Sequence, residues 1–167
     1  TFYFSAVNLG AYMLANSKII TGDLSIKTLL DISQRLPLSA HTKKAHSHTN
    51  QCTSKKNTPL TIIGSRSHAT KELSEFVDKI KKRCGKAEFI SAGSSLKFCL
   101  VAEGKADLYP RFGPTMEWDT AAGQAIVEQA KGRVVDMHTK EPLRYKKNTL
   151  VNPFFVVSGQ GFPFTQL

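Results

Sequence analysis

The chain has 167 residues, 41% of them hydrophobic and 22% charged, so it can bury the core of one ordinary domain and is not intrinsically disordered. Lys and Arg number 23 against 13 Asp and Glu, and this formal net charge of +10 favours polyanionic partners: nucleic acid, a membrane surface or small phosphorylated molecules. Three cysteines without a close pair exclude a disulfide-rich scaffold and a four-cysteine zinc module, and they are typical of a reducing compartment.

Residues 1–38 begin with a strand pattern. Aromatic and branched side chains flank an Asn8-Leu9-Gly10 break, a pattern that predicts two short strands joined by a turn. The uncharged stretch 1–17 lacks a basic start and is interrupted by polar residues, so it predicts neither a signal peptide nor a membrane span. Two strands alone are marginal in water, and the rest of the chain offers no obvious sheet beside them. We therefore expect the chain to begin within a larger structure.

Residues 39–58 form a predicted linker or solvated loop, because they are rich in His and Lys, contain no acid and carry almost no apolar side chain. Four potential metal ligands fall here: His41, His46, His48 and Cys52. Their spacing fits no compact zinc template, and we expect no metal site in this segment.

From residue 59 onward, strand patterns alternate with helix patterns. Strands are predicted over 60–63, 88–90, 106–112, 134–135 and 154–157, and helices over 71–83, 93–103 and 120–130. Such alternation indicates an α/β layered domain over residues 59–167.

Asp119 falls at the predicted start of the third helix, in the position of an N-cap, and small residues fill the turns that follow. A carboxylate at a helix start can hold Mg²⁺ while free backbone N–H groups face a phosphate. The same pattern also describes an ordinary capped helix that packs closely against a neighbour. Spacing alone leaves both interpretations open.

Other candidate ligand-binding residues also precede helices or follow strands. Gly93 and Ser94 open the second helix with Lys97 in its first turn, a pattern that fits either an anion cradle or a capped helix with an exposed lysine. Arg111 ends a strand before a Gly-Pro turn, where it can bind phosphate or form a surface ion pair. His68 follows the strand 60–63, at the end where ligands of α/β proteins gather, and a polar loop is the alternative.

Three further features are expected to be structural. Cys99 lies on an apolar helix face without a nearby His, so we expect a core thiol rather than a nucleophile. The single Trp118 is expected in the core. The basic residues near the end of the first of these helices lack interleaved aromatics, so they are expected to be solvated and to complement the helix dipole.

Four segments together resemble the inositol monophosphatase superfamily of Mg²⁺-dependent, lithium-sensitive phosphatases, and its bisphosphate nucleotidase branch in particular. They are residues 65–68, 93–104, 108–115 and 118–123. The Trp-Asp-x-Ala-Ala-Gly signature is specific to the superfamily, whereas the run Gly-Ser-Ser-Leu-Lys-Phe-Cys indicates the nucleotidase branch. The resemblance is strong over residues 59–157. It is weaker over 1–36, which look like the last strands of the family's N-terminal lobe, so it implies that residues 1–38 are a remnant of that lobe.

The resemblance implies a fold, an activity and a set of site residues. The fold would be the C-terminal αβα lobe of an inositol-monophosphatase-like sandwich with most of the N-terminal lobe missing. The activity would be a cytoplasmic hydrolase of sulfur assimilation that removes the 3′-phosphate of adenosine 3′,5′-bisphosphate to give AMP. Asp119 would be the catalytic Mg²⁺ ligand, and the nucleotide would contact His68, Gly93, Ser94, Lys97 and Arg111.

The sequence departs from the family in one respect. The family's first metal motif, a Glu followed by Asp-Pro-x-Asp-Gly-Thr, does not occur in it. We expect that motif upstream of Thr1, in the same or a companion chain that supplies the N-terminal lobe, and we expect the chain alone to be inactive. An inositol-phosphate phosphatase is the first alternative. A non-catalytic basic module that binds nucleic acid or a membrane surface is the second; otherwise we expect no nucleic-acid partner and at most peripheral contact with the inner face of the membrane.

Overall fold

The computed structural model describes residues 1–15, 25–37, 59–65 and 70–162. In chain order its elements are β1 (Phe2–Ala6), β2 (Gly10–Leu14), α1 (Ile26–Ile32), β3 (Gln34–Arg35), β4 (Leu60–Gly64), α2 (Lys71–Cys84), β5 (Ala87–Ser91), α3 (Leu96–Glu103), β6 (Leu108–Arg111), α4 (Glu117–Gln129), β7 (Arg133–Asp136) and β8 (Phe155–Ser158).

The larger sheet has five strands in the order β5-β4-β6-β8-β7. Strand β4 runs parallel to both β5 and β6, whereas β8 runs antiparallel to β6 and β7. The carboxyl ends of β5, β4 and β6 therefore meet at one edge of the sheet. Helix α3 follows β5 and helix α4 follows β6, so the chain segments that lead into both helices leave from this edge, where ligands of α/β sheets usually bind.

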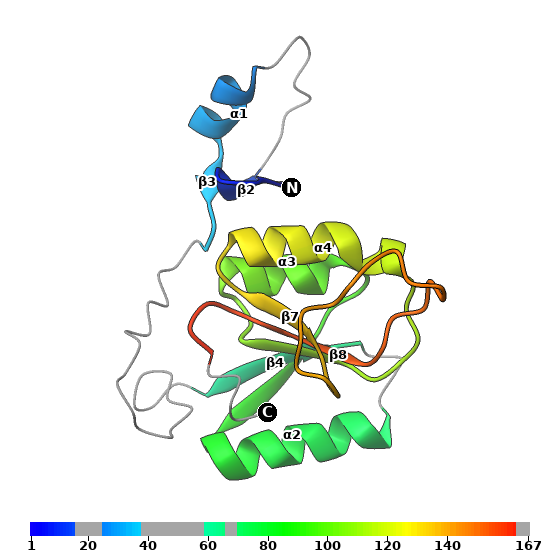
Figure 1. The fold of residues 1–167 in the computed structure, drawn as a ribbon. Helices are drawn as coiled ribbons and strands as arrows, with labels where there is room; N and C mark the ends of the chain where they lie inside the picture. The colour runs from blue at the N-terminus through cyan, green and yellow to red at the C-terminus, as the bar shows by residue number, and fades with distance from the viewer. Residues whose placement is uncertain (16–24, 38–58, 66–69, 163–167) are drawn as a thin grey trace.

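Helices cover both faces of this sheet. Helices α3 and α4 lie on one face and α2 on the other (Figure 1). Helix α2 buries Leu73, Phe76 and Ile80, the apolar stripe that the helical spacing predicts. Separate apolar clusters fill the two sides of the sheet, with Phe98 and Phe155 on the α3–α4 side and Ile62 and Phe76 on the α2 side. The predicted α/β layered fold is confirmed.

The N-terminal strands form a second sheet that packs on the helices. The predicted pair β1–β2 is confirmed, with Phe4 opposite Tyr12. The sequence offered no obvious sheet beside this pair, but β3 pairs with β2 as a third strand. Ala11 and Met13 point from β2 into the same core cluster as the α3 and α4 side chains. The three-stranded sheet is therefore stabilised because one of its faces is buried against the helices. Pairing between its strands would not have provided this stabilisation.

Helix α1 lies in a segment interpreted as strands and was not predicted. Ser25 is its N-cap, and the Ser25 hydroxyl accepts a hydrogen bond from the Thr28 N–H at 3.2 Å. The helix has 7 residues, too few for a clear apolar periodicity in the sequence. The predicted linker 39–58 lies outside the described residues, so the boundaries at 38 and 59 stay predictions. The expectation that His41, His46, His48 and Cys52 form no metal site also stays a prediction.

The cysteines differ in state. Cys99 is a free, buried thiol as predicted, and burial, followed by the Glu103 carboxylate, raises its pKa to about 11. Cys84 is disulfide-bonded, so the wide spacing of three cysteines did not exclude a single cross-link. None of the helices in the described ranges has both the length and the apolar character needed to cross a bilayer.

Candidate functional site

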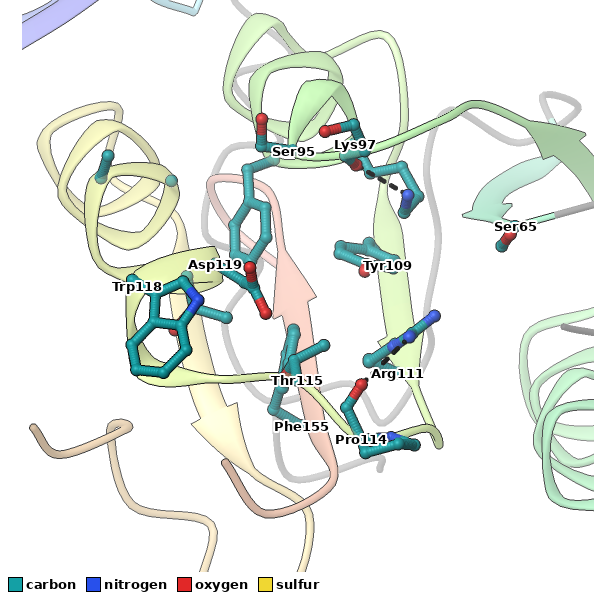
Figure 2. Close-up of a pocket in the computed structure, with 15 residues that line it drawn as sticks. Ser65, Ser95, Lys97, Tyr109, Arg111, Pro114, Thr115, Trp118, Asp119 and Phe155 are labelled. Carbon is teal, nitrogen blue, oxygen red and sulfur yellow. Dashed lines mark hydrogen bonds between the residues drawn. The ribbon is translucent and has the colours of Figure 1, made fainter. Parts of the chain in front are cut away.

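A cavity of about 480 Å³ opens at the sheet edge where the parallel strands end. Figure 2 shows side chains that converge on it from β6, from the segment before α3 and from the start of α4. The lining residues are Ser65, Ser94, Ser95, Lys97, Phe98, Tyr109, Arg111, Pro114, Thr115, Trp118, Asp119, Thr120, Ala122, Gly123 and Phe155.

Asp119 is the acidic side chain of this lining, and its place in the helix differs from the prediction. Helix α4 begins at Glu117 with Met116 as N-cap, so Asp119 is the third helical residue rather than the N-cap. The helix starts earlier because the Asp119 Oδ2 atom accepts a hydrogen bond from the Met116 N–H at 2.8 Å. This contact satisfies a backbone donor that the helix leaves open and fixes the orientation of the carboxylate. Figure 2 shows the carboxylate facing the cavity.

Lys97 is buried at the opposite wall. Its side chain is 4% exposed, which excludes the exposed lysine of the alternative interpretation. The ammonium donates to the carbonyl oxygens of Ser94 at 2.7 Å and Ala92 at 3.3 Å, and it lies 5.1 Å from the centre of the Tyr109 ring. Burial lowers the pKa of Lys97, and the nearby Arg111 lowers it further. An anion in the cavity would favour the charged form of this lysine.

Arg111 ends β6 beside the same cavity. It donates to the Pro114 carbonyl oxygen at 3.3 Å, and its Nε is buried without a hydrogen-bond partner in the described part of the chain. A guanidinium group carries five donors in a planar fork, so this one retains donors for an oxyanion. Arg111 and Lys97 together make the cavity rich in positive charge opposite a single carboxylate.

Two aromatic residues of the lining were not predicted to be there. Tyr109 lies between the cations and packs edge-on against Phe98 at 5.4 Å between ring centres. Burial raises the pKa of Tyr109 to about 12, so its hydroxyl stays neutral. Trp118 was expected in the core, and this is wrong: the side chain is 65% exposed at the mouth of the cavity. Its position on the first turn of α4 points it outward while Asp119, one residue on, faces inward.

The structure brings most of the predicted site residues together. Asp119, Ser94, Lys97 and Arg111 line one cavity. Gly93 lies next to Ser94 in the chain but does not line the cavity. His68 lies outside the described residues. Thr115 and Thr120 were missed, because a threonine near a helix start carries no signal that separates a cavity wall from a cap.

The chemistry of these donors fits a divalent cation in part. Mg²⁺ prefers hard oxygen ligands and usually takes one or two carboxylates together with water and phosphate oxygens. The Asp119 carboxylate is such a ligand, with one oxygen free of the Met116 contact. Across the described ranges no three His, Cys, Asp or Glu side chains gather at one point. Asp119 is thus suited to contribute one ligand to Mg²⁺, and the described residues do not complete such a site.

Comparisons with known proteins agree with the geometry. The model of the inositol monophosphatase family matches residues 14–160. The chain is 52% identical over 101 residues to the 3′(2′),5′-bisphosphate nucleotidase CysQ of Escherichia coli (strain K12), covering 60% of this chain and 39% of that protein. It is 50% identical over 101 residues to the protein of the same name from Buchnera aphidicola, covering 60% of this chain and 35% of that protein.

One solved structure matches nearly the whole chain. It is the crystal structure of CysQ from Bacteroides thetaiotaomicron, described as a bacterial member of the inositol monophosphatase family. The TM-score is 0.77 at 39% sequence identity, covering 95% of this chain and 53% of that chain. The matched region thus spans about half the length of that structure, and less of the curated relatives.

Proposed function

Because this chain belongs to the inositol monophosphatase family, we propose that the protein is a Mg²⁺-dependent phosphatase that removes the 3′-phosphate of adenosine 3′,5′-bisphosphate and produces AMP. The observation that carries the proposal is the convergence of Asp119, Lys97 and Arg111 on one cavity. The name of the E. coli relative, at 52% identity, supports the nucleotide rather than another phosphomonoester as substrate.

The two cations suit a substrate with more than one phosphate. Lys97 places a positive charge in a setting that is shielded from water, where electrostatic attraction to an anion is stronger than at the surface. Arg111 adds directional donors at the end of β6. A sugar carrying a single phosphate needs only one such contact, so the second cation favours a doubly phosphorylated ligand. Ser94 and Ser95 add polar groups at the start of α3.

Asp119 is the residue that would hold Mg²⁺. When bound, the ion neutralises phosphate charge and lowers the pKa of a coordinated water. The contribution of the chain is to hold one carboxylate oxygen toward the cavity while the Met116 N–H occupies the other. We propose that the remaining carboxylate ligands come from residues outside those described, consistent with the greater length of the relatives. We further propose cytoplasmic action and inhibition by Li⁺.

The test is phosphate release by the full-length protein that contains these residues. We expect release from adenosine 3′,5′-bisphosphate with Mg²⁺, none with a chelator, and near-complete loss in Asp119→Asn. We expect Arg111→Met to lower kcat/KM for the bisphosphate by about 10- to 100-fold, the loss of one charge-assisted hydrogen bond, while adenosine 3′-monophosphate is little affected. Arg35→Met, a matched change on β3 in the other sheet, is the control.

The other outcomes separate the alternatives. Faster turnover of inositol 1-phosphate than of the nucleotide would make the protein an inositol-phosphate phosphatase. Absence of any metal-dependent release, combined with salt-sensitive binding of RNA or anionic vesicles, would replace the proposal with a non-catalytic basic module.

A further inference from the structure

Asn152 is a buried polar residue behind the cavity wall. Its side chain is 5% exposed, and its Nδ2 group lies within hydrogen-bond distance of three oxygen atoms. These are the Met116 carbonyl at 2.8 Å, the Thr120 hydroxyl at 3.1 Å and the Thr115 hydroxyl at 3.2 Å. The Oδ1 atom is buried without a partner in the described part of the chain. Within the described residues, the hydrogen bonds of the Asn152 side chain thus go to residues at the start of α4.

Backbone hydrogen bonds hold the same two segments together. The Asn152 N–H donates to the Thr115 carbonyl at 2.8 Å, and the Glu117 N–H donates to the Leu150 carbonyl at 2.8 Å. The Glu117 carboxylate also accepts from the backbone N–H of Lys146 at 2.9 Å and from the Lys147 ammonium at 2.6 Å. The segment 146–152 is therefore hydrogen-bonded to the start of α4 at several points, and none of its residues lines the cavity.

Met116 links Asn152 to Asp119. Its carbonyl oxygen accepts hydrogen bonds from both Asn152 Nδ2, at 2.8 Å, and the Asp119 N–H, at 3.0 Å. Its own N–H donates to Asp119 Oδ2 at 2.8 Å. The orientation of the Asp119 carboxylate therefore depends on the peptide groups of one residue, and Asn152 fixes that residue from behind.

We propose that Asn152 is a positioning residue that sets the orientation of the Asp119 carboxylate for its metal ion. The proposal rests on the proposed function. Asn152 does not line the cavity, so it acts through Met116 and not on the substrate. Residues that orient a metal ligand in this way commonly change metal affinity by 10- to 100-fold when they are replaced. A merely structural role would lower stability and leave the metal affinity of the folded protein unchanged.

The experiment compares Asn152→Leu with Asn148→Leu in the full-length protein. Leucine has a similar volume and no charge, and Asn148 lies exposed in the same segment. For Asn152→Leu we expect the Mg²⁺ concentration for half-maximal activity to rise about tenfold or more, with KM for the nucleotide little changed. We also expect a smaller Mg²⁺-induced rise in Tm, a readout that does not depend on turnover. Asn148→Leu should match the wild type in both.

Three results would decide against the proposal or its premise. A lower Tm for Asn152→Leu with an unchanged Mg²⁺ requirement overturns the positioning role and leaves the phosphatase intact. A raised KM with an unchanged Mg²⁺ requirement also overturns it, because Asn152 would then act on substrate. If the wild type shows no Mg²⁺-dependent activity and no Mg²⁺-induced change in Tm, the proposed function fails first. Should Asn152→Leu not fold, Asn152→Ser, whose side chain is too short to reach Met116, carries the same expectations.

Discussion

Lys97 is the charged group of the cavity that water reaches least. Three surroundings act on it: the carbonyl oxygens of Ala92 and Ser94, the face of Tyr109, and the like charge of Arg111. The carbonyls and the ring favour the ammonium form, whereas burial and Arg111 disfavour it. Burial and Arg111 prevail, so the pKa of Lys97 lies below that of a solvated lysine.

This shift predicts a pH-dependent phosphate site. Below the lowered pKa, Lys97 is charged and attracts an anion; as the pH rises through that pKa, the charge and its contribution to binding are lost. The advantage of the wild type over Lys97→Met in binding inorganic phosphate should therefore shrink at a pH below the ordinary lysine value of about 10.4. Inhibition constants for phosphate in the full-length protein, measured across alkaline pH, provide the test.

Lys82→Met is the control, because Lys82 is exposed on α2, across the sheet from α3 and α4. Its effect on phosphate inhibition should be small at every pH. If wild type and Lys97→Met bind phosphate equally well at every pH, Lys97 does not contact the anion. If the wild type keeps a large and constant advantage up to pH 10.4, the pKa of Lys97 is not lowered.

At the scale of elements, the close approach of α3 and α4 keeps the start of α4 at the cavity. Gly123 makes that approach possible, because a Cβ atom placed there would lie 2.6 Å from the Phe98 ring. Phe98 cannot move away easily, since it packs between Tyr109 and Phe155 with ring centres 5.4 and 5.9 Å distant. Gly123, a small residue of the 118–123 motif, thus allows the two helices to pack closely, which is one of the two interpretations that the sequence left open. Asp119 of the same motif faces the cavity.

Gly123→Ala should therefore destabilise the protein. Helix propensity alone would favour alanine by about 1 kcal/mol, but overpacking of a filled core costs about 1–3 kcal/mol. We expect a net loss in the free energy of unfolding, measured by chemical denaturation. Ala125→Gly on the exposed face of α4 is the control and should show the propensity effect alone, a loss of about 1 kcal/mol. A more stable Gly123→Ala would mean that the two helices can separate at no cost.

Across the whole molecule, two sets of contacts join the N-terminal sheet to the layered domain. Tyr3 on β1 donates a hydrogen bond to the buried Glu103 carboxylate at the end of α3. Lys105 pairs with the same carboxylate at 2.6 Å. Ala11 and Met13 add apolar contacts to the same interface. Because Glu103 is buried and charged, its partners on both sides are needed to offset desolvation, so the sheet is an integral layer of this fold.

The chain of 167 residues on its own is predicted to be inactive. The described residues offer Mg²⁺ one carboxylate at the cavity, so we expect phosphate release from adenosine 3′,5′-bisphosphate not to exceed the uncatalysed rate. The measurement compares this chain with a version extended to the length of its relatives, after thermal unfolding has shown that the shorter chain is folded. Comparable turnover by both would mean that Asp119 and the residues around it suffice for catalysis.

The layered domain could be predicted from the sequence, because periodic apolar spacing and turn residues act locally. Leu73, Phe76 and Ile80 gave the buried face of α2, and Gly85 its end. The family could also be predicted from the sequence, since the segment around Asp119 is a contiguous motif. Helix α1 escaped prediction because a short helix that is stabilised by its cap leaves little periodic signal.

The surroundings of each site residue depend on contacts between segments that are far apart in the chain. Helix α4 starts at Glu117, earlier than predicted, because two acceptors satisfy the N–H groups at its start. The Asp119 carboxylate accepts from the Met116 N–H, and the Leu150 carbonyl accepts from the Glu117 N–H. Lys97 is buried and Trp118, contrary to expectation, is exposed, because the exposure of a side chain depends on which segments pack beside it. The same applies to Asn152, which is remote in sequence from Asp119 and reaches it through Met116. Local propensity contains none of these contacts, because they arise only where segments far apart in the chain meet.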